Sequence, residues 1–227
     1  MATSSASLVL VAFVLVVAVS ASVDDLKSPQ KYFLIDNMCN YKVWPANLAG
    51  AGSPGLDFKG VALEPRRLNR ILLPVPHGWS GRIWGRTLCP SDATGKFTCV
   101  TGDCGTGRLD CAGGSGPTPP ATVAEFTMDG KGGKDSYDVS LVDGFNLPMR
   151  VLPHGGCPVS GCAADLNAAC PADQQVTSAG GVVACKASAG SRFFKKACPG
   201  AKSSGADNAL GCAGEDDGYT ITFCPPS

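Results

Sequence analysis

Apolar and polar residues alternate along four short stretches of this chain, as they do in strands that bury one face. The stretches are residues 82–87, 122–128, 136–142 and 219–223. Residues 31–38 and 40–44 are rich in aromatic and β-branched side chains and are predicted as the first strands. Glycine-rich turns separate these segments, and a helical period is almost absent. The pattern predicts a mainly β protein built as an antiparallel β-sandwich.

The alternation also assigns each side chain to a face of its strand. Arg82, Trp84 and Arg86 share one face, opposite Ile83. The apolar faces of the next two strands are predicted to consist of Ala124, Phe126, Met128, Tyr137, Val139 and Leu141. Residues 45–60 have the glycine and proline content of a long surface connection.

Two acidic residues are predicted to face each other across a hairpin. Residues 129–135 form its loop, which places Glu125 opposite Asp138 on the polar face. Like charges so placed are unfavourable, so we expect a compensating cation or a raised pKa. Arg82 is the candidate cation, and Asp143, at the end of the second strand, is a candidate third acidic residue.

Paired carboxylates suit glycoside hydrolysis, in which one group protonates the leaving oxygen and the other attacks or activates water. They also suit a structural ion-pair network or an acidic surface that binds a ligand. The pairing alone favours these non-catalytic interpretations.

The chain changes character after residue 151. Its cysteines there lie among alanine, glycine and proline, which predicts a disulfide-held lobe with little core of its own. Residues 162–170 are predicted as a short helix. The strand at residues 219–223 is predicted to return to the first sheet, where Cys224 can reach Cys39.

The N-terminus resembles a secretory signal peptide. Residues 8–19 are uniformly apolar, and small residues follow before two aspartates, so residues 1–21 are predicted to be removed by cleavage after Ala21. The apolar run is shorter than the roughly 20 residues of a membrane span.

Export places the twelve cysteines in an oxidising compartment, where an even number favours complete pairing into disulfides. The densest group, Cys99, Cys104 and Cys111, lies among glycines. A zinc knuckle is the alternative for these three thiols, and the export signal favours disulfides.

Charge and histidine content bear on two possible functions, nucleic-acid binding and metal binding. Lysine plus arginine and aspartate plus glutamate number nineteen each, so nothing predicts a nucleic-acid partner. His77 and His154 are predicted in separate loops, and we expect no metal and no cofactor. The basic cluster at residues 66–70 is interpreted as a solvated face rather than a binding patch. A monomer is the simplest expectation.

Residues 95–111 carry a resemblance to a known family. The signature residues of thaumatin-like proteins are all present: Gly95, Phe97, Cys99, Thr101, Gly102, Asp103, Cys104, Gly107 and Cys111. The resemblance continues through residues 119–126, 144–149, 191–199 and 223–225. Residues 22–227 are thus similar to a shortened, twelve-cysteine member of the plant pathogenesis-related, osmotin- and zeamatin-like proteins.

The resemblance implies a fold and a set of disulfides. A β-sandwich of residues 30–150 and 213–226 would face a disulfide-rich loop domain of residues 151–212 across an acidic cleft. The implied bridges are Cys39–Cys224, Cys89–Cys99, Cys104–Cys111, Cys157–Cys212, Cys162–Cys198 and Cys170–Cys185.

The resemblance also implies a cleft lined by an arginine and four acidic residues. Arg82, Glu125, Asp138 and Asp143 match the first four positions. The last aspartate normally follows the Cys-Pro of residues 198–199, where this chain has Gly200, and Asp207 is not at the matching position.

The implied function is that of a secreted, apoplastic plant defence protein. We expect it to be antifungal and to bind β-1,3-glucan or another component of the fungal wall or membrane through the cleft. One alternative is a weak endo-β-1,3-glucanase, with Glu125 as the acid and Asp143 or Asp138 as base or nucleophile. Another is a rigid scaffold that inhibits a foreign hydrolase through its loops.

Overall fold

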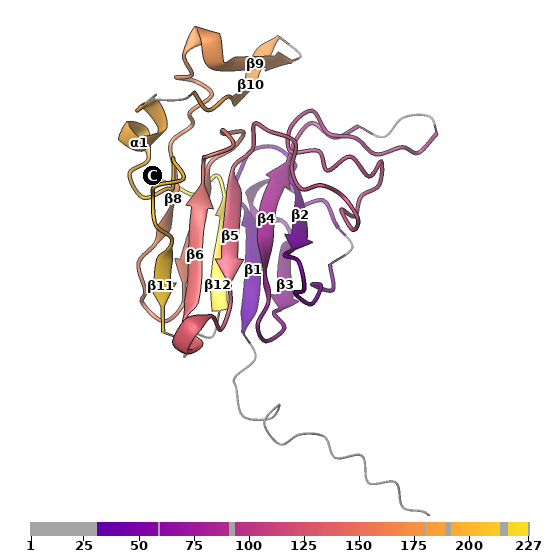
Figure 1. Cartoon of the computed structure of the whole chain (residues 1–227). Helices are drawn as coiled ribbons and strands as arrows, with labels where there is room; N and C mark the ends of the chain where they lie inside the picture. The colour runs from indigo at the N-terminus through magenta and orange to yellow at the C-terminus, as the bar shows by residue number, and fades with distance from the viewer. Residues whose placement is uncertain are drawn as a thin grey trace, which may run out of the picture.

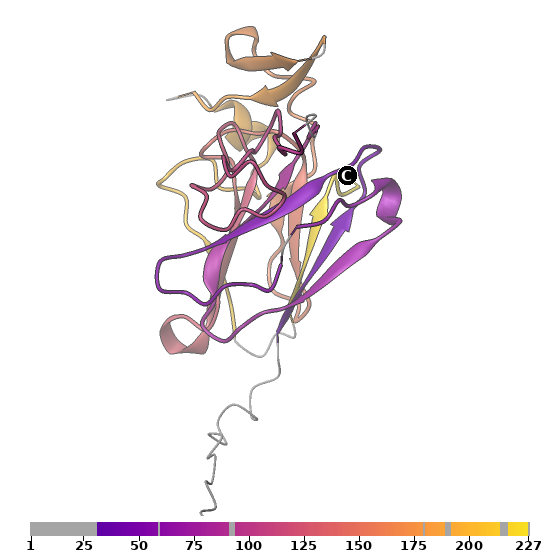
Figure 2. The same ribbon diagram turned by 90° about the vertical axis from the view of Figure 1, so that its right-hand side faces the viewer.

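The computed structural model describes residues 31–58, 60–90, 94–178, 180–188, 192–213 and 218–226. The predicted signal peptide lies outside these residues. Two five-stranded sheets pack face to face (Figure 1), and Figure 2 shows the two layers from the side. Among the described residues, none of the helices has the length and apolar character needed to cross a membrane.

The first sheet has the strand order β3-β1-β12-β7-β8. Its strands are β1 (Tyr32–Asn37), β3 (Arg70–Pro74), β7 (Met149–Pro153), β8 (Ser160–Cys162) and β12 (Gly218–Phe223). The returning last strand is confirmed, because β12 lies beside β1 with Phe223 opposite Asn37. This pair is parallel, whereas the sequence predicted an antiparallel sandwich. The other pairs of the sheet are antiparallel.

The second sheet has the order β11-β6-β5-β4-β2 and is antiparallel throughout. Its strands are β2 (Trp44–Ala49), β4 (Ser80–Arg86), β5 (Val123–Thr127), β6 (Asp135–Ser140) and β11 (Leu210–Cys212). The predicted strand at 40–44 was wrong, because β2 runs through part of the stretch assigned to a surface connection. Pro45 fits in β2 because this strand lies at the sheet edge, where a missing N–H is tolerated.

The main core lies between the two sheets. The predicted inward faces of β5 and β6 are confirmed: Ala124, Phe126, Tyr137 and Val139 are all at most 3% exposed. Phe126 lies 4.6 Å from Phe33 of the facing sheet, ring centroid to centroid. The strand alternation therefore predicts correctly which side chains the sandwich buries.

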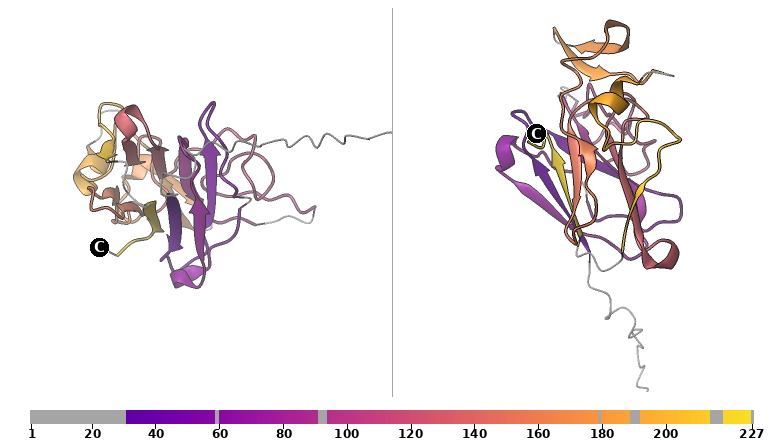
Figure 3. Two further views of the ribbon diagram at one scale, coloured as in Figure 1. Left: turned by 90° about the horizontal axis from the view of Figure 1, so that it is seen from below. Right: turned by 90° about the vertical axis from the view of Figure 1, so that its left-hand side faces the viewer.

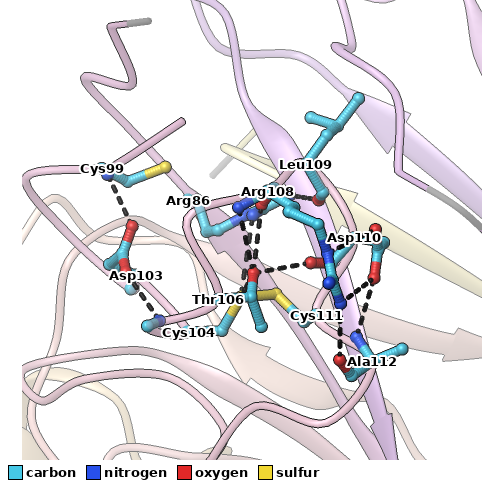
Figure 4. Close-up of a disulfide and its surroundings, with 12 residues drawn as sticks. Arg86, Cys99, Asp103, Cys104, Thr106, Arg108, Leu109, Asp110, Cys111 and Ala112 are labelled. Carbon is cyan, nitrogen blue, oxygen red and sulfur yellow. Dashed lines mark hydrogen bonds and ion pairs between the residues drawn. A yellow bond between two sulfur atoms is a disulfide. The ribbon is translucent and has the colours of Figure 1, made fainter. Parts of the chain in front are cut away.

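The glycine-rich loop of residues 95–111 covers part of the outer face of β4 (Figure 4). Trp84 and Arg86 lie on the same face as Arg82, yet both are fully buried beneath the loop. The Trp84 indole N–H donates to the Gly102 carbonyl at 2.8 Å, and Arg86 donates to the Leu109 carbonyl at 2.6 Å. Burial lowers the pKa of Arg86 to about 10.

All twelve cysteines form disulfides, and the six bridges are those that the resemblance implied. The zinc-knuckle alternative is therefore wrong for Cys99, Cys104 and Cys111. In the loop, Asp103 accepts hydrogen bonds from the backbone N–H groups of Cys99 and Gly105, both at 2.7 Å. The Cys89–Cys99 and Cys104–Cys111 bridges and the Asp103 carboxylate hold the conformation of this loop, which has little hydrophobic core of its own.

A small lobe stands at one end of the sandwich (Figure 3, right). It contains β9 (Gln175–Ser178), β10 (Gly181–Cys185) and helix α1 (Phe193–Ala197). The described residues also contain single-turn 3-10 helices: η2 (Pro65–Arg67), η3 (Lys131–Gly133) and η4 (Ala172–Gln174), which directly precedes β9. The strands β8 and β11 and the second half of β7 fall within residues 151–212 but pair inside the two large sheets.

The helix predicted for residues 162–170 was wrong. Cys162 ends β8, and the rest of the segment consists of bends and turns, in which Asp165 Oδ1 accepts the backbone N–H of Asn167 at 3.1 Å. Such a bond offers the backbone an alternative to a helix. Leu166 and both terminal cysteines are buried in the small core of the lobe, which also contains Phe145 and Phe194.

Candidate functional site

A groove of about 510 Å³ runs over the outer face of the second sheet. Strands β4, β5 and β6 supply Arg82, Glu125 and Asp138, and Gly81 and Ala209 also line it. A Cβ atom at Gly81 would lie 2.5 Å from the Leu48 carbonyl oxygen and 2.6 Å from the Trp79 ring. Glycine there allows the edge strand and the tryptophan to approach closely.

The charged residues of the groove are in cross-strand register. Arg82 is paired with Glu125 between β4 and β5, and Glu125 with Asp138 between β5 and β6. The predicted opposition of the two acidic residues is thus confirmed. Directly opposed side chains on one sheet face are close enough to interact, so the hairpin register itself forms the site.

Two cations offset the paired carboxylates. Arg82 Nε lies 3.0 Å from Glu125 Oε1, which confirms the counter-charge expected from the sequence. Lys202 Nζ lies 3.3 Å from Glu125 Oε2 and 3.8 Å from Asp138 Oδ2. The sequence analysis did not identify Lys202. The expected need for a compensating cation beside the two carboxylates was the one signal that pointed to such a residue.

The backbone of Lys202 is fixed against the sheet. Its N–H donates to the Val139 carbonyl at 2.9 Å, and its carbonyl accepts from Leu141 at 2.7 Å. A parallel bridge also pairs Lys202 with Ser140. The ammonium group is therefore delivered to the carboxylates by a segment bound to β6 and not by a free loop.

Asp138 is the most perturbed group of the groove. Burial raises its pKa to about 6, the Glu125 charge adds to the rise, and Lys202 and Arg82 oppose it. The residue is 5% exposed, and its Oδ1 atom has no hydrogen-bond partner among the described residues.

Asp143 is not brought to this groove. It is exposed and lines a second hollow of about 390 Å³, together with Pro119, Pro120 and Lys186. Of the four predicted cleft residues, the structure therefore assembles Arg82, Glu125 and Asp138 and places the fourth elsewhere on the surface.

The two histidines have separate partners. His77 Nδ1 lies 2.8 Å from Asp129 Oδ2, and His154 Nε2 lies 2.8 Å from the Thr220 hydroxyl. Within the described ranges, no group of three or more histidine, cysteine or acidic side chains is arranged to hold a metal ion.

A family model described as the thaumatin family matches residues 37–190, more than half of the chain. The chain belongs to the thaumatin family. Pathogenesis-related protein 5 of Arabidopsis thaliana is 44% identical, over 85% of this thaumatin-family chain and 90% of its own length. A protein of Prunus avium named glucan endo-1,3-beta-glucosidase is 42% identical, over 83% and 88%.

A solved structure of the same fold is titled the thaumatin-like xylanase inhibitor TLXI. It is 27% identical to this thaumatin-family chain, with a TM-score of 0.53, and the match covers 85% of this chain and 99% of the other. The family match includes Arg82, Glu125 and Asp138, whereas Lys202 lies beyond it.

Gly200 and Asp207 are placed outside the groove lining of this thaumatin-family chain. The Gly200 carbonyl accepts from the Gly161 N–H at 3.1 Å and from the Ser160 hydroxyl at 3.0 Å. Asp207 is held by Lys195 at 2.9 Å, and this hydrogen bond contributes most to lowering its pKa below the ordinary range. Lys202 therefore reaches the carboxylates in a segment where the family resemblance implied a further aspartate.

Proposed function

We propose that this chain is a secreted plant defence protein that binds β-1,3-glucan of the fungal wall through the groove on the second sheet. The observation that carries the proposal is the Arg82–Glu125–Asp138 register, which lines an open groove with hydrogen-bonding groups. Relatives named as a pathogenesis-related protein and as a glucan endo-1,3-beta-glucosidase support a defence role and a glucan ligand. Six disulfides and the apolar N-terminus support export to the apoplast.

The site geometry favours binding over hydrolysis. A glycosidase needs two carboxyl groups that both reach the scissile bond. Here both Glu125 oxygens are paired with cations, and Asp138 is nearly buried. Asp143, the other candidate base, lines a different hollow. We therefore place the glucanase alternative second to a binding role.

Co-sedimentation with insoluble β-1,3-glucan tests the proposal. Wild type should sediment with the polymer, Glu125→Gln should bind several-fold more weakly, and Asp173→Asn, at an exposed site outside the groove, should match wild type. Asp143→Asn reports whether the second hollow contributes to glucan binding. Failure of wild type to bind would reject the proposal, and release of reducing sugar from laminarin would restore the enzymatic alternative.

A hydrolase inhibitor is a second candidate, and the thaumatin-like xylanase inhibitor supports it. The basic cluster offers a rigid projection: Arg66 has a positive φ of 57° and its N–H donates to the Cys39 carbonyl, and Leu68 is 77% exposed. Such a cationic, apolar tip suits the acidic active site of a glycoside hydrolase.

Inhibition assays separate the two candidates. If the basic cluster at residues 66–70 is the inhibitory surface, Arg66→Glu should abolish inhibition of a fungal xylanase or β-1,3-glucanase. Lys196→Glu on α1, also exposed, should leave inhibition unchanged. Equal inhibition by both variants and wild type would exclude the Arg66 loop.

A further inference from the structure

One oxygen atom in the groove stands out by its burial and lack of a partner. Asp138 lines the groove and is 5% exposed, yet its Oδ1 makes no hydrogen bond within the described part of the chain. A buried acceptor without a partner is costly, and native structures rarely keep one without a reason. Because Asp138 lines the groove, a ligand that binds there lies beside this carboxyl group.

The charges around this carboxyl group balance. Glu125 faces it from β5 in direct register, and Arg82 follows from β4. Lys202 comes from the opposite side, on the segment bound to β6. Two cations and two carboxylates leave the site without net charge, so a cationic ligand has no excess negative charge to bind.

Resting on the proposed function of the groove, we propose that Lys202 is the internal counter-ion that keeps Asp138 ionised, and that the Asp138 carboxylate then accepts a hydrogen bond from a hydroxyl group of an uncharged polysaccharide. An ionised carboxylate is an acceptor only, and hydrogen bonds to charged acceptors are about twice as strong as neutral ones. Lys202 is in this sense a positioning and charge-setting residue of the groove.

The partly buried position of Lys202 strengthens its electrostatic effect on Asp138. Its side chain is 22% exposed and that of Asp138 is 6% exposed, so solvent screens the pair only partly. Burial and Glu125 raise the pKa of Asp138 to about 6, and Lys202 is the larger of the two groups that lower it. Removal of the Lys202 charge should therefore leave Asp138 protonated at a pH where wild type is ionised.

The first experiment titrates the Asp138 carboxyl carbon by NMR in the oxidised protein without ligand. Lys202→Met keeps the aliphatic stem and removes the charge, and it should raise the titration midpoint by roughly one pH unit. Lys202→Arg keeps the charge and should restore a midpoint close to wild type. An unchanged midpoint in Lys202→Met would overturn the counter-ion role.

The second experiment measures the affinity for a soluble β-1,3-glucan hexasaccharide from about pH 5 to pH 8. Wild type should lose roughly five- to tenfold in affinity as Asp138 becomes protonated. Lys202→Met should show the same loss of affinity at a higher pH. Asp138→Asn should bind weakly, with an affinity that does not change across this pH range. Near-UV circular dichroism of each variant checks that the fold is retained.

The outcomes separate this inference from the proposed function. Binding by wild type with no pH step would overturn the acceptor role of Asp138 while leaving glucan binding intact. No binding by wild type would reject the proposed function, and the ligand-free titration would still decide whether Lys202 holds Asp138 ionised.

Discussion

At the scale of single residues, Asp138 shows how burial and neighbouring charges compete. It ionises with a pKa of about 6 because burial and Glu125 outweigh Lys202 and Arg82. In the unfolded chain the carboxyl group ionises near its ordinary value of 3.8. Between these two values the folded protein binds more protons than the unfolded chain, so Asp138 makes stability fall as the pH rises through this window.

Asp138→Asn should therefore stabilise the protein at neutral and alkaline pH. The free energy of unfolding is expected to exceed that of wild type by about 1–3 kcal/mol at pH 8, and the difference should disappear near pH 4. Urea denaturation at both pH values measures it, with Asp173→Asn as the exposed control. A variant less stable than wild type at pH 8 would contradict the predicted cost of ionisation.

At the scale of elements, β4 connects the core, the groove and the glycine-rich loop. Ile83 and Gly85 face the other sheet, and Arg82, Trp84 and Arg86 face outward. Gly85 faces the core, where a Cβ atom would meet the side chains of Leu147, Val43 and Phe223 at 2.8, 2.9 and 3.0 Å. A side chain at this position would clash with these core residues.

Gly85→Ala should lower the free energy of unfolding by about 1–3 kcal/mol, the usual cost of overpacking a well-filled core. Gly211→Ala is the matched control in β11 of the same sheet, where the nearest atom to a new Cβ lies 3.9 Å away. Chemical denaturation of both variants tests the prediction. Equal stabilities would show that the sheets adjust without cost.

At the scale of the whole molecule, the two ends of the described chain are joined. The parallel β1–β12 pair places Cys39 beside Cys224, and their disulfide spans 185 residues. Cys104–Cys111 spans only 7 residues in the surface loop. A longer closed loop restricts the unfolded chain more, so the two bridges should differ in their effect on stability.

Replacing both cysteines of a bridge by alanine tests this difference. Loss of Cys39–Cys224 should cost about 5 kcal/mol and loss of Cys104–Cys111 about 2 kcal/mol, on the chain-entropy account. Urea denaturation of the two double variants under oxidising conditions gives both values. Equal losses would indicate that native packing around the bridges outweighs the entropy of the unfolded chain.

Particular residues show how far the sequence predicts this molecule. The register of Glu125 and Asp138 follows from a symmetric hairpin, and the buried faces of β5 and β6 follow from alternation. The β2 strand was missed because its proline and small residues are typical of loops. The helix at 162–170 was wrongly predicted because local polar bonds and burial outweighed helical propensity.

The sequence by itself determined the β class, the pairing of Glu125 with Asp138, the counter-charge from Arg82 and, through the family resemblance, all six disulfides. These depend on local alternation, turn composition and a specific cysteine pattern. Only the tertiary structure decided that Lys202 reaches Glu125 and Asp138, that Asp143 lies outside the groove and that Trp84 and Arg86 are buried. The reason is physical: strand periodicity gives the face of a side chain, but which distant segment covers that face depends on packing between segments far apart in the chain.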